Sequence, residues 1–145
     1  VLAKLYWENG PIPVPGLYDA VRPLTDKERA AVRKLPWDDG KFRTEVGVVP
    51  SARYALERGL NVYEQTWRRP AVTVIAQEAS SLKGASNQVL PTAKAIVSCR
   101  IVPDQDPAQV VEQLRAYLSA DAPWGVEVTV KQAGAGCKWW MTDPN

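Results

Sequence analysis

The chain has 145 residues, 46% of them hydrophobic and 23% charged, a balance typical of one globular domain. Its net charge of +2 is too small to indicate a nucleic-acid surface, and it has no apolar run long enough to predict a membrane span. Histidine is absent, and general-base catalysis and zinc binding both depend heavily on imidazole, so a self-contained hydrolase is not expected.

The first half of the chain is predicted to be helical and rich in proline. Residues 1–9 carry apolar side chains at helical spacing before an Asn-Gly stop, and they are expected to be the tail of a helix whose beginning is missing. The prolines that follow forbid regular structure. Four helices are then expected, over about 25–35, about 39–46, from Ser51 to before Gly59, and over 61–68.

The ends of these helices carry recognisable signals. Thr25 and Glu28 form a T-x-x-E capping box, and Asp38 can cap the next helix. Arg68-Arg69 is a tight basic cluster ahead of a proline, and we interpret it as a solvated helix end, where cations are favoured.

The second half changes to strand character. Residues 71–79 are short and β-branched, typical of a strand, and 80–91 form a polar loop. Residues 92–102 alternate, with Val97 and Cys99 toward a core and Arg100 toward water or a ligand. A helix capped by Asp106, with Pro107 at its first position, carries one apolar stripe. A third strand is expected over 126–131, where valines alternate with polar residues.

The order helix tail, strand, strand, helix, strand predicts an α+β fold. With a strand placed before the helix tail it becomes the β-α-β-β-α-β, or ferredoxin-like, motif: an antiparallel sheet with helices on one face. The first strand is missing from this chain, so one strand edge is expected to lie open. Residues 1–145 would form a single domain, with a helical insertion at about 11–70 and a sheet-and-helix core at 71–133.

Few residues indicate chemistry when taken alone. Asn87 and Gln88 are ordinary turn amides, and Arg100 is either a carboxylate-binding fork or a solvated arginine. Asp104 and Asp106 fit a turn and a helix cap better than a catalytic pair. Cys99 and Cys137 share no motif spacing, which favours reduced thiols in a cytoplasmic protein over a disulfide framework or a zinc site.

Two stretches, PGLYDAVRPLTDKERAAVRKLPWDD at 15–39 and GASNQVLPTAKAIVSCRIVPDQDPAQVVEQL at 84–114, resemble a known family. They are similar to the lid, or dimerisation, domain of the dinuclear zinc metallopeptidases that include aminoacylase, carnosine dipeptidase, acetylornithine deacetylase and succinyl-diaminopimelate desuccinylase. The resemblance implies a parent catalytic domain holding two zinc ions, and a ferredoxin-like lid that makes the homodimer. The chain would then be an excised internal fragment, and WWMTDPN at 139–145 would return into the catalytic domain.

The resemblance also implies what the lid does. Asn87, or Gln88 if the spacing to Pro91 is shifted by one, and Arg100 would hold the carboxylate side of a peptide or N-acyl amino acid substrate. The zinc ligands and the lid histidine of the family would lie outside this chain, so the chain alone is expected to hold no catalytic residue and no metal, and to be inactive. The alternative is a free-standing ferredoxin-like regulatory or protein-interaction module that uses an open strand edge or a face pocket.

Overall fold

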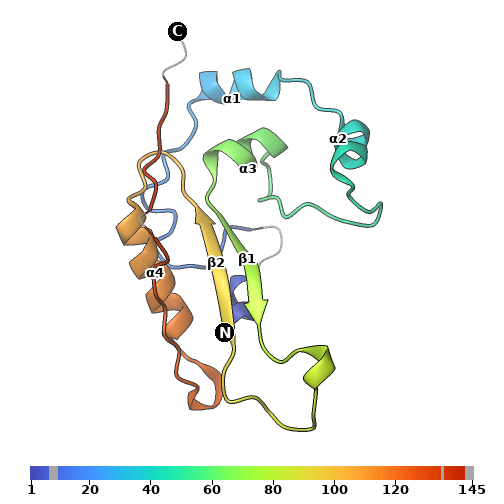
Figure 1. Cartoon of the computed structure of the whole chain (residues 1–145). Helices are drawn as coiled ribbons and strands as arrows, with labels where there is room; N and C mark the ends of the chain where they lie inside the picture. Colours follow the sequence, from blue (N-terminus) through green and yellow to red (C-terminus); the bar gives the residue numbers. More distant parts are fainter. Residues whose placement is uncertain (7–9, 135, 143–145) are drawn as a thin grey trace.

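A two-stranded antiparallel sheet lies at the centre of the structure, a computed structural model that describes residues 1–6, 10–134 and 136–142. Its strands are β1 (Ala71–Glu78) and β2 (Lys94–Arg100), and helix α4 (Pro107–Ser119) runs along one side of them (Figure 1). Helices α1 (Asp26–Arg33), α2 (Asp39–Val46) and α3 (Val62–Arg68) gather beyond one end of the sheet. The predicted α+β class with an antiparallel sheet is confirmed.

The register of the sheet decides which residues share an end and a face. The pairing runs from Ala71 opposite Arg100 to Glu78 opposite Lys94, with one irregularity between Val74 and Ala76. Because successive side chains alternate between faces, the pair Val72 and Cys99 points to the core, and Arg100 points to the open face. The loop over 79–93 therefore leaves and re-enters the sheet at the end opposite Arg100.

Helix α4 supplies three of the buried apolar side chains of the core. Asp106 caps it by accepting a hydrogen bond from the Gln109 backbone N–H at 3.0 Å, as predicted. One stripe of the helix, Val110, Leu114 and Leu118, is buried against Val72 and the core face of β2. The apolar spacing of this helix was therefore sufficient to predict its buried face.

The proline-rich segment is irregular, as expected, yet it is part of the core. Ile12, Val14 and Leu17 are all buried beneath α4. The buried amide of Gln105 joins this segment to the end of β2, because it donates to the Leu17 carbonyl at 2.7 Å and accepts from the Val102 N–H at 2.9 Å. A buried amide with both hydrogen bonds satisfied fixes the two segments relative to one another.

The N-terminus is tied to the far end of α4. Residues Leu2–Leu5 form a short 3-10 helix, η1, in place of the expected helix tail, whose last residues 7–9 lie outside the described part. The Lys4 ammonium donates to the carbonyls of Tyr117 and Ala120 at 2.6 and 2.5 Å. A cation at this position satisfies carbonyls that a helix C-terminus leaves unpaired and complements the helix dipole.

Three of the four helices predicted in the first half are confirmed, and the fourth is wrong. The segment from Ser51 to Gly59 is irregular because its neighbours hold it in an extended path. The Tyr54 hydroxyl donates to Asp39 at 2.7 Å, and the Arg43 guanidinium donates to the Ala52 carbonyl at 3.1 Å. Contacts to α2 therefore replace the hydrogen bonds that a short helix would have made.

The third strand predicted over 126–131 is also wrong, since this segment joins no ladder in the described structure. Val130 does pack against the core, and its carbonyl accepts from Arg115 at 3.3 Å. Alternation of side chains places one face of a segment on a core, but a strand also needs a neighbouring backbone to pair with. The segment has the pattern of a strand and lacks such a neighbour.

The interpretation of Arg68-Arg69 as a solvated helix end is wrong as well. Arg68 pairs with Glu28 at 3.3 Å, and Arg69 pairs with Glu57 at 3.1 Å. Two segments distant in sequence bring these carboxylates to the end of α3, which the local sequence could not predict. None of the helices that the structure describes has the length and apolarity needed to cross a membrane.

Candidate functional site

Arg100 is the last residue of β2 and is exposed on the face of the sheet that α4 does not cover. Within the described residues it takes part in none of the ion pairs, although most other arginines of the chain do. A guanidinium that is held on a strand and has no internal carboxylate partner is well suited to bind a carboxylate through two parallel hydrogen bonds.

The two loop amides predicted beside it lie elsewhere. Asn87 and Gln88 are both exposed in the loop over 79–93, in which Leu82–Gly84 form a short 3-10 helix, η2, capped by Ser81. The Gln88 backbone N–H donates weakly to the Ser86 hydroxyl at 3.4 Å, so the turn is local. Both side-chain amides are free to face a ligand, and the structure does not favour one over the other.

The structure does not bring the loop amides and Arg100 together. The loop returns to the sheet at Lys94, and six residue steps of strand separate Lys94 from Arg100. At a rise of roughly 3.3 Å per residue this is about 20 Å. One carboxylate cannot be held by Arg100 and by a loop amide of the same chain, since the two groups sit at opposite ends of the hairpin.

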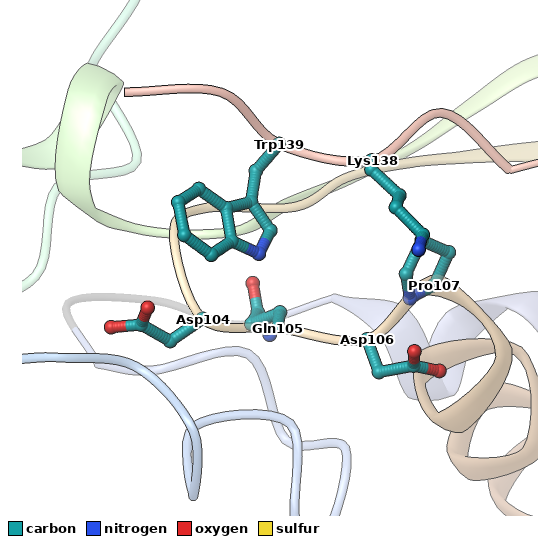
Figure 2. A pocket seen from close by; sticks show the side chains of 6 residues that line it. All are labelled: Asp104, Gln105, Asp106, Pro107, Lys138 and Trp139. Carbon is teal, nitrogen blue, oxygen red and sulfur yellow. The ribbon is translucent and has the colours of Figure 1, made fainter. Parts of the chain in front are cut away.

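The Asp104 and Asp106 carboxylates are both occupied, as a turn and a cap predict. Asp104 pairs with Arg22 at 3.1 Å, and Asp106 caps α4. They border an open cavity of about 460 Å³ where the C-terminal segment crosses the start of α4. Figure 2 shows the Trp139 ring above Asp104 and the Lys138 side chain reaching toward Pro107. Both carboxylates at this cavity therefore have structural partners, one in an ion pair and one in a helix cap.

Cys99 is a core thiol, as predicted. It lies half-buried against the apolar cluster, and burial raises its pKa to about 11. The thiol therefore stays protonated and unreactive near neutral pH. Cys99 and Cys137, both within the described residues, are free cysteines.

A metal centre has no candidate in the part of the chain that the structure describes, where no group of three or more carboxylate or cysteine side chains could hold an ion. The titratable residues that do cluster lie on helices α1 and α3 instead. Glu64 is buried beside Arg33 at 3.3 Å and Arg29 at 3.7 Å. Sequence analysis missed this cluster, although the spacing of Asn61 and Glu64 is itself a capping pattern that could have drawn attention to it.

The chain matches the family model of the peptidase dimerisation domain over residues 3–126. It is 32% identical over 110 residues to the cysteinylglycine-S-conjugate dipeptidase of Corynebacterium striatum, covering 76% of this chain and 24% of that protein. It is 26% identical over 120 residues to the human beta-Ala-His dipeptidase, covering 81% of this chain and 23% of the relative. The chain thus spans about a quarter of the length of these relatives.

Solved structures agree with the sequence comparison. An M20 family metallo-carboxypeptidase from Sulfolobus solfataricus superposes with a TM-score of 0.65 at 28% identity, covering 81% of this chain and 30% of that one. A dipeptidase from Saccharomyces cerevisiae superposes with a TM-score of 0.66 at 24% identity, covering 82% of this chain and 24% of that one, a likeness of fold.

Proposed function

Because the chain belongs to the peptidase dimerisation domain family, we propose that it is the lid of a metal-dependent dipeptidase or related amidohydrolase. The parent enzyme would be a cytoplasmic homodimer joined through this lid, with two zinc ions in a separate catalytic domain. Zinc-activated water would cleave a peptide or N-acyl bond there. The lid alone would hydrolyse nothing, because its part is to position the substrate.

The observation that carries the proposal is the guanidinium of Arg100 on the open face of the sheet, which forms no ion pair with the residues that the structure describes. A dipeptidase that reads the C-terminal end of its substrate must recognise a free carboxylate, and a planar fork on a rigid strand recognises that group by charge and by geometry. Lys94 is a second cation on the same strand and face. The proposal for Arg100 therefore depends on the geometry of its guanidinium as well as on its charge.

The loop amide has a separate role in this proposal. Asn87 and Gln88 belong to the loop that enters β2 at Lys94, and Lys94 is itself about 20 Å from Arg100 by the rise of the strand, too far to share its carboxylate. In a homodimer the loop of one copy can instead reach the substrate bound by the other copy. The two ends of the hairpin would then serve two different active sites.

The role of Arg100 can be tested in the intact peptidase. We expect Arg100→Met to raise KM about tenfold or more for substrates with a free carboxylate, because a hydrogen-bonded charge pair contributes roughly 1.5–3 kcal/mol. The KM of Arg100→Lys should lie between the values for Arg100→Met and the wild type, because lysine keeps the charge but cannot form two parallel hydrogen bonds. Steady-state kinetics measures both.

The matched control is Lys27→Met, which removes an exposed cation from α1, away from both ends of the hairpin, and should leave KM unchanged. Substrates with a C-terminal amide provide a second control. They lack the free carboxylate, so the wild type and Arg100→Met should have similar KM values for them. An unchanged KM in Arg100→Met, with free-carboxylate substrates, would overturn this role.

A further inference from the structure

The helical block over residues 21–69 has an unusual interior. All of these residues are described, and Glu64, with 1% of its surface exposed, is the one buried side chain among them. The buried apolar cluster of the protein takes its members from other parts of the chain. Ion pairs of Glu64 with Arg29 and Arg33, and of Glu28 with Arg68, hold the block instead.

The aromatic side chains of this block gather in one cluster. Five aromatic rings form a continuous chain of contacts, which we call the aromatic ridge: Trp37, Phe42, Tyr54, Tyr63 and Trp67. Neighbouring ring centroids lie 4.9 to 6.1 Å apart, within the range of favourable aromatic pairs. Its rings come from α2, from α3, from the segment between α1 and α2, and from the segment between α2 and α3.

The two tryptophans of the ridge are open to solvent. Trp37 is 38% exposed and Trp67 is 51% exposed, whereas the three rings between and beside them are half-buried. Both tryptophans contact the Tyr63 ring, so their exposed surfaces belong to one cluster. A clustered apolar surface marks a contact with another body far more often than a lone exposed side chain does. Tryptophan and tyrosine are also the residue types most enriched where proteins meet.

The tyrosine hydroxyls of the ridge are already satisfied. The Tyr54 hydroxyl donates to Asp39 at 2.7 Å, and the Tyr63 hydroxyl donates to the Pro36 carbonyl at 2.5 Å. Burying a hydroxyl that lacks a partner costs free energy, whereas these two can be covered without that penalty. The tyrosines of the ridge therefore do not oppose its burial.

We propose that the aromatic ridge packs against the catalytic domain of the same peptidase; this inference rests on the proposed function. The relatives are about four times as long as the matched region, since this chain covers 24% and 23% of them, so most of their polypeptide lies outside the lid and can cover it. A block without an apolar core gains the most from such cover, because burial of the ridge supplies the hydrophobic stabilisation that its ion pairs do not.

The test measures tryptophan accessibility in the full-length dimeric peptidase, by hydroxyl-radical oxidation and mass spectrometry. Trp37 should be oxidised several-fold more slowly than an unprotected tryptophan. Trp67→Glu should abolish most of this protection, because it places a charge in the contact, while the dimer remains intact by sedimentation. Trp67→Phe, which keeps an apolar ring, should retain the protection and keeps the test informative if the glutamate variant misfolds.

Thr66→Glu is the matched control, since it adds the same charge to the same helix one residue away, outside the ridge, and should leave Trp37 protected. Rapid oxidation of Trp37 in the wild type would overturn the proposal. Loss of the dimer in Trp67→Glu would also overturn it, by assigning the ridge to a second copy of this chain. The KM of Arg100→Met is independent of this readout, so failure of the proposed carboxylate site would be seen separately.

Discussion

Glu64 is the residue on which the helical block most depends. Its side chain accepts from the Asn61 backbone N–H and faces Arg33 and Arg29. Burial by itself raises the pKa of the Glu64 carboxyl, but the Asn61 hydrogen bond and the two guanidinium groups outweigh burial, and the net pKa lies below the ordinary value. The ionised form is therefore the one that the fold stabilises.

Glu64→Gln should lower the free energy of unfolding at pH 7 by about 1–3 kcal/mol, because it leaves two arginines without their counter-charge. Since the folded pKa lies below the unfolded one, the contribution of Glu64 is complete above the unfolded pKa and is lost as pH falls through the folded pKa. Urea unfolding at several pH values should show the variant and the wild type converging in acid.

Glu45→Gln is the control for that substitution. Glu45 is exposed and lies 3.9 Å from Lys41, so its removal should change stability by less than about 0.5 kcal/mol. Equal losses in the two variants would contradict the central role given to Glu64.

Among the elements, α4 and α2 begin in the same way but differ in what they bury. Asp106 and Asp38 each accept a hydrogen bond from the backbone N–H three residues on, at 3.0 and 2.9 Å. Helix α4 buries three side chains in the core, whereas α2 buries none. The stability of α4 is therefore coupled to the whole fold, and that of α2 is mainly local.

This difference predicts unequal effects from equal substitutions. Asp106→Ala should lower the free energy of global unfolding by about 1 kcal/mol, the usual contribution of a helix cap. Asp38→Ala should remove the same kind of bond with little effect on global unfolding, and should instead speed amide exchange in α2. Denaturant unfolding and hydrogen exchange together check the pair, and a larger global loss from Asp38→Ala would contradict it.

At the scale of the whole molecule, the described structure is built around a sheet of two strands, with a helix on one face and three helices beyond one end (Figure 1). A sheet this small is marginal by itself. The family to which the chain belongs is a dimerisation domain, so association with a second copy is the natural source of additional stability.

We therefore expect the unfolding temperature of the chain to rise with protein concentration, because mass action favours the folded dimer over unfolded monomers. Calorimetry over a hundredfold range of concentration, with sedimentation at the same concentrations, measures this. A concentration-independent midpoint would count against dimerisation through this chain.

Local sequence determined those features that depend on near neighbours along the chain. The caps at Thr25, Asp38 and Asp106, the buried stripe of α4 and the outward direction of Arg100 all follow from spacing and from the alternation of strand side chains. The resemblance to a family rests on two contiguous motifs, so it too was visible in the sequence alone.

Tertiary structure decided the rest, because the deciding partners are distant in sequence. Contacts to α2 keep the segment after Ser51 out of a helix, and 126–131 finds no backbone to pair with in the part of the chain that the structure describes. Register, which no local pattern shows, places Asn87 and Arg100 at opposite ends of the hairpin. The same reason explains the aromatic ridge and the ion pairs of Glu64: both are made by side chains that only the folded chain brings within reach of one another.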